Sequence, residues 1–209
     1  MTILYSIITE SFQKNFFDEY LAKLPPFFVE KIRKFRRWQD AQASLLGKLL
    51  ISEVLTDGDL SILNHIQFNT YGRPFIKNYP DFNISHSGNY VVLVMDNSSR
   101  VGIDIEEIKP IDPLEFKSQM TNFEWDNITQ SKDRLYAFYL YWTQKESVIK
   151  AYGKGLSSPL SSFEIRNGLC LLDQNLFYVD EVNLVPEIVC FVASDREIKN
   201  IPVKKVINF

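Results

Sequence analysis

Hydrophobic residues in the first third of the chain recur at helical spacing. Residues 12–24 follow this spacing until the pair Pro25–Pro26 interrupts it. A longer stretch, from about Phe35 to Leu55, places apolar residues three and four positions apart, and the Asp-Gly pair at 57–58 supplies a stop signal. The pattern therefore predicts a short helix followed by a longer one.

The middle of the chain changes to a pattern of short strands. Between Ile66 and Ile105, short β-type runs alternate with turn-forming segments. A second helical pattern spans about Lys132 to Tyr152, with Ser131 as its predicted N-cap, and strand-like runs fill the remainder. This order predicts an α+β fold of two halves, residues 1–100 and 101–209, with a ligand cleft between them.

Composition and charge narrow the classes of function. Of the 209 residues, 45% are hydrophobic, which is enough to fill a packed core. The formal net charge of −3 argues against a protein devoted to binding nucleic acid. No stretch approaches the roughly 20 apolar residues of a membrane span, so we expect a cytoplasmic protein with no membrane partner. The basic residues between Lys31 and Arg37 form either a solvated helix face or a binding region for an anion.

Two acidic residues in the segment VGIDIEE share one face of a predicted strand. Asp104 and Glu106 are two positions apart, while the apolar residues between them point to the other face. Neighbouring carboxylates repel each other and need a cation, a shared proton or solvent between them. Mg²⁺ is the cation that fits best. The alternative is a solvated strand end, or a salt bridge to Lys109.

A second pair of charged residues lies in the predicted helix near residue 150. Glu146 and Lys150 are one turn apart and so share a helix face. The spacing allows a carboxylate for a metal ion and an ammonium group for phosphate oxygens in one site. The alternative is a surface ion pair, which contributes only about 0.2–0.5 kcal/mol.

Three further candidates lie in the segments YGRPFI and NISHSGN. Arg73 on a turn is suited to contact a phosphate, and Ser85 and His86 offer a hydroxyl and an imidazole at a strand end. The alternative is hairpin-turn chemistry without a function. Because the chain has 2 histidines, a metal site built from histidines is excluded.

Together these segments resemble the phosphopantetheinyl transferases of the Sfp type. The resemblance rests on GRP at 72–74, NISHS at 83–87, VGIDIE at 101–106 and WxxKExxxKAxGxGL at 142–156. The four motifs occur in the family's order and approximate spacing, which makes the combination specific. The remainder of the chain agrees with the family only in length and general pattern.

The resemblance implies a fold, an activity and partners. The fold would have two similar α+β halves related by pseudo-twofold symmetry, with coenzyme A in the cleft. The activity would be Mg²⁺-dependent transfer of the phosphopantetheine group of coenzyme A to a serine of an apo acyl or peptidyl carrier protein, releasing adenosine 3′,5′-bisphosphate. Because one chain would complete its own cleft, we expect a monomer.

The resemblance also implies roles for the acidic residues and the lysine. The implied Mg²⁺ ligands are Asp104, Glu106 and Glu146. Lys150 would contact the pyrophosphate and assist the leaving phosphate. Glu124 is the candidate general base, with Asp126 as the fallback. Thr121 and Glu124, however, also have the spacing of a helix capping box.

The resemblance assigns the remaining contacts to coenzyme A and the carrier protein. The residues implied for the phosphates of coenzyme A are Arg73, Ser85 and His86, and those implied for its 3′-phosphate are Arg33 and Arg37. We expect the carrier protein to dock on residues 110–131, where Phe116, Met120 and Phe123 are the apolar candidates. Two alternatives stay open: another Mg²⁺-dependent phosphoester enzyme, and a coenzyme A-binding module without catalysis.

Overall fold

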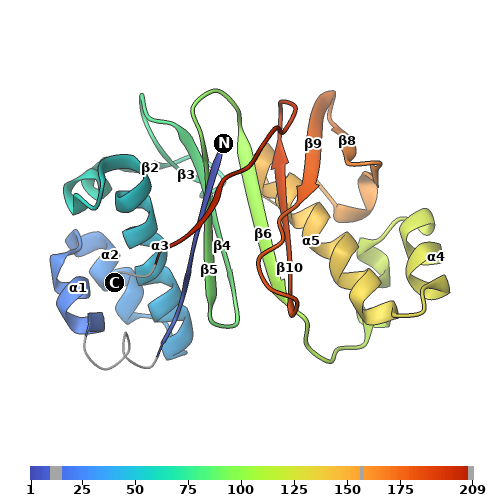
Figure 1. Cartoon of the computed structure of the whole chain (residues 1–209), viewed down its shortest axis with the longest axis horizontal. Coiled ribbons are helices and arrows are strands. Elements are labelled where there is room, and N and C mark those ends of the chain that lie inside the picture. The colour runs from blue at the N-terminus through green and yellow to red at the C-terminus, as the bar shows by residue number, and fades with distance from the viewer. Residues whose placement is uncertain (10–15, 156–157, 207–209) are drawn as a thin grey trace.

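The computed structural model describes residues 1–9, 16–155 and 158–206 and consists of two α+β halves (Figure 1). The N-terminal half contains the helices α1 (Phe17–Lys23), α2 (Pro26–Arg33) and α3 (Trp38–Thr56). The C-terminal half contains α4 (Asn122–Gln130) and α5 (Arg134–Tyr152). Short 3-10 helices are η2 (Leu60–His65), η3 (Pro113–Gln119) and η5 (Leu160–Ser162). Helices lie on the two outer sides and strands in the centre, so the α+β prediction is confirmed.

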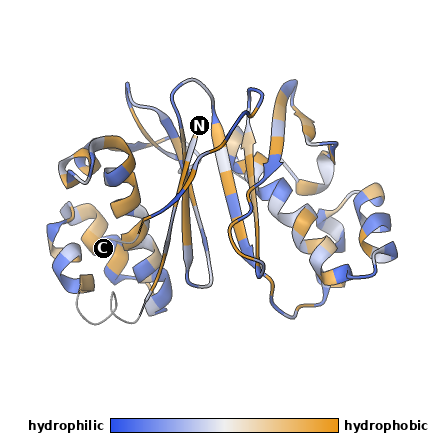
Figure 2. Ribbon diagram, in the orientation of Figure 1, coloured by the Kyte–Doolittle hydropathy of each residue, from blue (hydrophilic) through white to orange (hydrophobic). Residues whose placement is uncertain are grey.

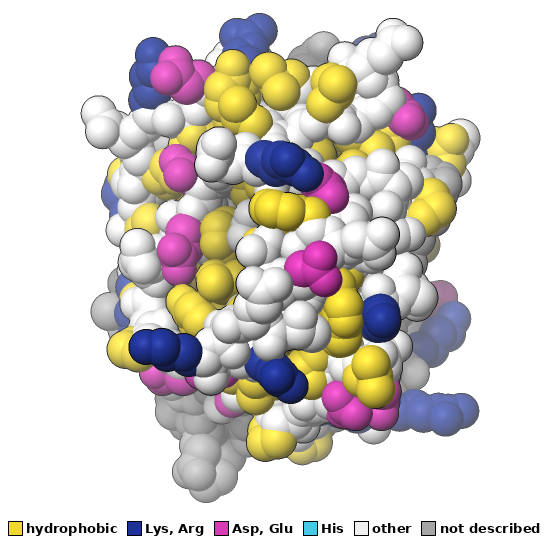
Figure 3. Space-filling model, turned by 90° about the vertical axis from the view of Figure 1, so that its right-hand side faces the viewer, with side chains coloured by type: hydrophobic (Ala, Val, Ile, Leu, Met, Phe, Trp, Pro, Cys, Tyr) yellow, Lys and Arg dark blue, Asp and Glu magenta, His cyan; other side chains and the backbone are white. Residues whose placement is uncertain are grey.

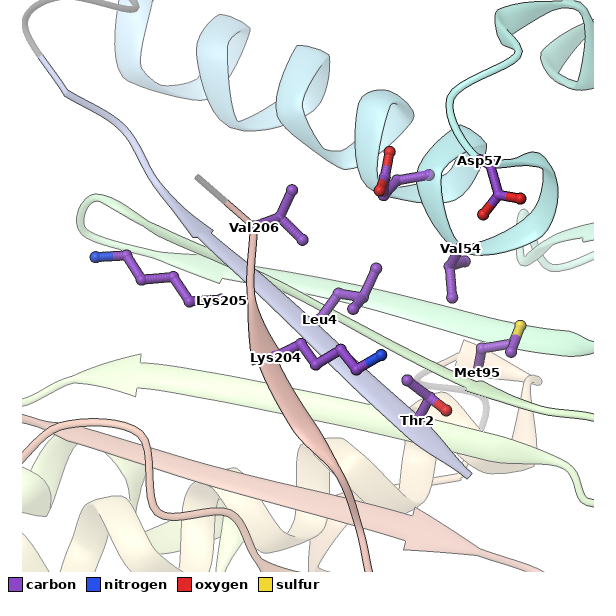
Figure 4. A pocket seen from close by; sticks show the side chains of 9 residues that line it. Thr2, Leu4, Val54, Asp57, Met95, Lys204, Lys205 and Val206 are labelled. Atoms are coloured by element: carbon purple, nitrogen blue, oxygen red, sulfur yellow. The ribbon is translucent and has the colours of Figure 1, made fainter. Parts of the chain in front are cut away.

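Each half has its own sheet. The first has the order β11-β1-β5-β4 and contains β1 (Thr2–Ile7), β4 (Asp81–Ser87), β5 (Tyr90–Asp96) and β11 (Val203–Lys205). The second has the order β6-β10-β9-β8-β7 and contains β6 (Val101–Glu107), β7 (Ile165–Arg166), β8 (Leu169–Leu172), β9 (Asn175–Glu181) and β10 (Ile188–Ser194). A separate hairpin contains β2 (Ile66–Phe68) and β3 (Pro74–Ile76). Because β11 pairs in parallel with β1, the chain returns to the first half near its end (Figure 4).

The helix boundaries agree with the sequence pattern except at one cap. Helix α3 ends before Asp57, which has the left-handed φ of 51° common at helix ends. Helix α5 is capped by Asp133, whose carboxylate accepts the backbone N–H of Tyr136 at 2.9 Å. The predicted cap Ser131 is therefore wrong, and this residue instead ends α4. The first predicted helix is described from Phe17 onward, and its residues 12–15 lie outside the described residues.

An apolar cluster between the two sheets joins the halves. It includes Val92 and Val94 of the first sheet and Val101, Ile103 and Ile105 of the second. Figure 2 shows the hydrophobic colour along these central strands. Because the odd-numbered residues of β6 fill this cluster, the even-numbered Asp104 and Glu106 face the opposite side.

Polar side chains of β4 also bind the backbone of β6. Strand β4 contributes every second residue, and each side-chain oxygen accepts a backbone N–H that an adjacent strand would otherwise pair. The pairs are Asp81 with Val101 (2.8 Å), Asn83 with Ile103 (2.9 Å) and Ser87 with Glu107 (3.0 Å). Asp81 and two polar residues of the NISHS motif therefore hold the two sheets together.

The glycine of the VGIDIE motif allows α5 to pack directly on β6. A Cβ atom added at Gly102 would collide with the backbone of Ser147 and Ala151 in α5. Only glycine allows this approach. The close contact fixes the last turns of α5, which carry Glu146 and Lys150, beside the acidic face of β6. No helix among the described residues is long and apolar enough to cross a membrane.

Candidate active site

A pocket of about 320 Å³ at the junction of the two halves collects most of the predicted site residues. Strand β4, strand β6 and helix α5 contribute its lining, which is Ile84, Ser85, His86, Asp104, Glu106, Trp142, Glu146 and Lys150. A larger pocket of about 610 Å³ lies beside β11 (Figure 4). Its lining comes from β1, β5, α3 and the chain's end and includes none of the motif residues. The smaller pocket is therefore the candidate active site.

Lys150, Ser85 and Asp104 form a connected group in this pocket. The Nζ of Lys150 donates to the Oγ of Ser85 at 2.8 Å and lies 2.5 Å from Oδ1 of Asp104. The Oγ of Ser85 donates to the same carboxylate oxygen at 2.9 Å. The side chain of Asp104 is buried, at 5% exposed, whereas that of Lys150 is 26% exposed. The ammonium group therefore neutralises the buried acid while remaining open to a ligand in the pocket.

The other two acids of the pocket have raised pKa values. Burial, and then the negative charge of Asp104, raise the pKa of Glu106 and of Glu146. Ser87 stabilises the Glu106 carboxylate by donating a hydrogen bond of 2.9 Å. Burial lowers the pKa of His86, which favours the neutral imidazole. Three carboxylates around one cavity repel each other, so the cavity favours the binding of a cation.

The pocket contains a buried carboxylate oxygen that has no partner in the part of the chain that the structure describes. Oδ2 of Asp104 is buried without a hydrogen bond among the described residues. An unpaired buried carboxylate oxygen is costly, and it is the donor type that hard cations such as Mg²⁺ prefer. As the side chains stand, the described residues contain no group of three His, Cys, Asp or Glu that could hold a metal ion. The donor chemistry fits Mg²⁺, although the acids are not arranged as a three-residue cage.

Glu124 lies outside the pocket. Its side chain is fully buried and pairs with Lys145 at 2.9 Å. It also completes the capping box of α4, in which it accepts the backbone N–H of Thr121 at 2.9 Å. A carboxylate enclosed in this way cannot meet a serine of another protein, so its placement argues against a role as general base. The fallback Asp126 is exposed on α4 and does not line the pocket.

Arg73 does not line the pocket either. Its guanidinium donates to the backbone carbonyls of Lys150 and Val101 and to the carboxylate of Asp81. The side chain is only 11% exposed. The structure therefore places the guanidinium behind the active site, where it binds protein groups, and the phosphate contact of Arg73 stays an untested prediction.

A second, mostly apolar pocket of about 240 Å³ adjoins the first. Ile84 and His86 line both pockets, and Lys31 and Lys48 supply the positive charge of the second. Arg37 lines a different pocket that also includes His86, and Arg33 is exposed on α2. Lys48 was missed by the sequence analysis. The signal for it was a lysine inside the apolar run LLGKLLI of a helix.

Only one of the three apolar candidates for carrier docking is open to solvent. Met120 is 6% exposed, and Phe116 packs against the aromatic rings of Phe138 and Trp142. Phe123 is 41% exposed, with the guanidinium of Arg166 over its ring. On the outer face of the C-terminal half, basic and acidic side chains are interspersed, without a basic stripe (Figure 3).

Family comparisons identify the class of protein to which this site belongs. The family model described as "4′-phosphopantetheinyl transferase superfamily" matches residues 100–173. A second model, described as "4′-phosphopantetheinyl transferase, N-terminal", matches residues 12–98. The two matches together cover both halves of the fold and all three elements that form the pocket.

Curated relatives agree with the family models. The chain is 40% identical over 155 residues to the 4′-phosphopantetheinyl transferase Sfp of Bacillus subtilis, covering 71% of this chain and 69% of the relative. It is 40% identical over 163 residues to the 4′-phosphopantetheinyl transferase gsp of Aneurinibacillus migulanus, covering 72% and 64%. The human L-aminoadipate-semialdehyde dehydrogenase-phosphopantetheinyl transferase is 36% identical over 163 residues, covering 69% and 53%. The chain belongs to the 4′-phosphopantetheinyl transferase superfamily, which confirms the resemblance.

Proposed function

We propose that this chain transfers the 4′-phosphopantetheine group of coenzyme A to a serine hydroxyl of an apo carrier protein. Adenosine 3′,5′-bisphosphate is the other product. The observation that carries the proposal is the convergence of Ser85, Asp104 and Lys150 in one pocket at the junction of the halves. These three residues come from segments that are far apart in the sequence. A simple surface ion pair between Glu146 and Lys150 would not explain why Ser85 and Asp104 also lie beside the lysine.

The reaction requires neutralisation of charge more than covalent catalysis. The serine oxygen forms a bond to the β-phosphorus of coenzyme A, and the bond from that phosphorus to the bridging oxygen breaks. Negative charge grows on the bridging oxygen, which leaves with the adenosine bisphosphate. Lys150 is 26% exposed and directed into the pocket, so its ammonium group is suited to stabilise that charge.

Glu146 is the residue that we propose as the acceptor of the serine proton. Mg²⁺ usually takes one or two carboxylates from a protein, and the pocket holds three. Asp104 and Glu106 share one face of a strand and form the natural pair for the ion. Glu146 comes from α5, and its raised pKa makes it a stronger base than an ordinary glutamate. This assignment replaces Glu124 and takes Glu146 out of the implied ligand set.

Mg²⁺ is the proposed cofactor. When bound, it would neutralise oxygens of the pyrophosphate and orient them for attack. The unpaired Oδ2 of Asp104 and the carboxylate of Glu106 are the proposed protein ligands. The magnesium proposal can be tested without catalysis, by calorimetric titration of Mg²⁺ into the parent protein and into Asp104→Asn, where we expect binding to be lost.

The second pocket is proposed to take the adenosine end of coenzyme A. Its apolar lining fits a flat base, and Lys31 and Lys48 offer positive charge for the 3′-phosphate. Among the described residues neither lysine forms an ion pair, and each lies over an aromatic ring, Phe68 and Phe28 respectively. The 3′-phosphate is therefore proposed to contact these lysines instead of Arg33, while Arg37 stays at the neighbouring pocket.

The central experiment is mass spectrometry of apo carrier domains incubated with the protein, coenzyme A and Mg²⁺. We expect a gain of one phosphopantetheine on carriers that keep their serine and none on the serine-to-alanine carrier. Glu146→Gln should lower kcat while leaving Mg²⁺ binding intact, and loss of Mg²⁺ binding would make Glu146 a ligand instead.

Two outcomes would contradict the proposed function. Coenzyme A binding without modification of any carrier would favour a binding module. Cleavage of simple phosphoesters without a carrier would favour a different Mg²⁺-dependent enzyme.

A further inference from the structure

The loop that contains the GRP motif is attached to the end of helix α5. The side-chain nitrogen of Asn69 donates to the carbonyl oxygen of Gly153 at 2.9 Å. The side-chain oxygen of Asn69 accepts the backbone N–H groups of Tyr71 and Arg73, both at 2.9 Å. Asn69 therefore shapes the loop and joins it to the residue that ends the helix.

Arg73 extends this attachment to three elements of the fold. Its guanidinium donates to the carbonyl of Lys150 in α5, to the carbonyl of Val101 in β6 at 2.7 Å and to the carboxylate of Asp81 in β4 at 2.6 Å. Asp81 in turn accepts the backbone N–H of Val101. The arginine thus connects the strand that carries Ser85, the strand that carries Asp104 and the helix turn that carries Lys150.

The carbonyl of Lys150 is one of the groups at a helix end that have no partner inside the helix. Arg73 supplies that partner. Gly153 makes room for it, because a Cβ atom there would lie 2.9 Å from Cδ of Arg73. Gly153 also has a left-handed φ of 76°, which ends the helix at this point. The position of the Arg73 side chain therefore depends on the absence of a side chain at Gly153.

We propose that Arg73 is a positioning residue that holds the last turn of α5, and so sets the place of the Lys150 ammonium group in the pocket. The proposal rests on the proposed function, because Lys150 is taken to act on the phosphoryl group. Turning the guanidinium toward a phosphate would leave the Lys150 carbonyl without its partner and would break the ion pair with Asp81, so the structure disfavours that movement.

The test compares Arg73→Ala and Arg73→Lys with the parent in steady-state transfer to a carrier protein. We expect kcat to fall about 10- to 100-fold in Arg73→Ala, because small displacements of a catalytic group are costly. The KM for coenzyme A should change less than about threefold, since a tenfold change would correspond to a lost binding contact. Arg73→Lys keeps the positive charge but loses the several N–H donors of the planar guanidinium, so we expect a kcat between those of the parent and Arg73→Ala.

A matched control is Arg100→Ala. Arg100 is an exposed arginine near the same helix end, where it donates to the carbonyl of Tyr152 at 3.4 Å. We expect this control to keep the parent kcat. Asp81→Asn, which weakens the anchor of Arg73, should lower kcat in the same direction as Arg73→Ala.

Each remaining outcome has a defined meaning. A KM raised tenfold or more with kcat preserved would make Arg73 a phosphate ligand and overturn the proposal. A lower melting temperature with unchanged kcat well below melting would make Arg73 purely structural and also overturn it. If the parent modifies no carrier, the proposed function fails, but calorimetry can still test whether Arg73 binds the ligand. Retained coenzyme A affinity in Arg73→Ala supports a positioning role. A tenfold loss of affinity contradicts it.

Discussion

Helix α5 carries two lysines that each pair with a carboxylate, yet the two pairs have different surroundings. Lys145 and Glu124 are both 0% exposed, and Lys145 also donates to the carbonyls of Leu160 and Phe163 at 2.7 and 2.6 Å. Lys150 is 26% exposed, although Asp104, at 5%, is almost as buried as Glu124. In both pairs the carboxylate keeps one buried oxygen without a hydrogen bond among the described residues, Oε1 of Glu124 and Oδ2 of Asp104. The first pair is closed and the second is open to the pocket.

The difference shows how a structural ion pair can be distinguished from a reactive one. Lys145 has partners on all sides, so a substrate has nothing to gain by approaching it. Lys150 has one side directed into a cavity that collects negative charge. Burial lowers the pKa of Lys145, but the lysine is enclosed by protein, so a substrate cannot reach it. The pair that matters for chemistry is therefore the one whose lysine is open to the pocket.

The largest expected effect comes from breaking the closed pair. Lys145→Met leaves Glu124 as a buried unpaired charge, so we expect the free energy of unfolding to fall by about 3–5 kcal/mol. Transfer activity measured well below the melting temperature should stay close to that of the parent. Urea denaturation and the transfer assay test both parts. Loss of transfer at unchanged stability would show that Lys145 has a role in catalysis.

The open pair should respond in the opposite way. Lys150→Met removes a charge that stabilises the transition state, so we expect kcat to fall about 10²- to 10³-fold. The loss of unfolding free energy should be smaller than for Lys145→Met, because Lys150 is partly exposed and water can reach the site of the lost charge, whereas Lys145 is fully buried. Stopped assays with a carrier protein measure kcat. If kcat stays within threefold of the parent, the distinction between the two pairs fails.

Lys48 provides a third and smaller test. This half-buried lysine faces the second pocket and has no carboxylate partner among the described residues. We expect Lys48→Met to raise the KM for coenzyme A about tenfold, or about 1.4 kcal/mol, with little change in kcat. Lys34→Met, on the exposed basic segment, is the matched control and should keep the parent KM.

The same lysine predicts a pH dependence. Burial, and then the charge of Lys31, lower the pKa of Lys48 to about 8. A bound phosphate raises that pKa, so binding takes up a proton, and coenzyme A affinity is full below pH 8 and falls as the pH rises through the bound-state pKa. KM measured across this range should increase with pH in the parent and less so in Lys48→Met. Equal slopes would show that Lys48 does not contact the phosphate.

The sequence predicted the acids and the lysine of the pocket because their relations are local. The two-residue period of a strand puts Asp104 and Glu106 on one face, and one helix turn puts Glu146 beside Lys150. The capping box of Thr121 and Glu124 was equally local and is confirmed. Part of the last motif, Leu156, lies outside the described residues.

The relations between residues on different elements could not be derived from the sequence. Nothing near Glu124 in the sequence shows that Lys145 of another helix encloses it. Nor does the sequence around Arg73 show that its guanidinium binds Asp81, Val101 and Lys150.

By itself, the sequence determined the α+β plan, the family and the polar residues that line the active-site pocket. Periodicity and motif order are properties of the linear chain, so they can be recognised without knowing how the chain packs. Only the tertiary structure decided which charges are closed and which stay open. That distinction depends on burial and on partners from distant segments, and a linear sequence contains neither.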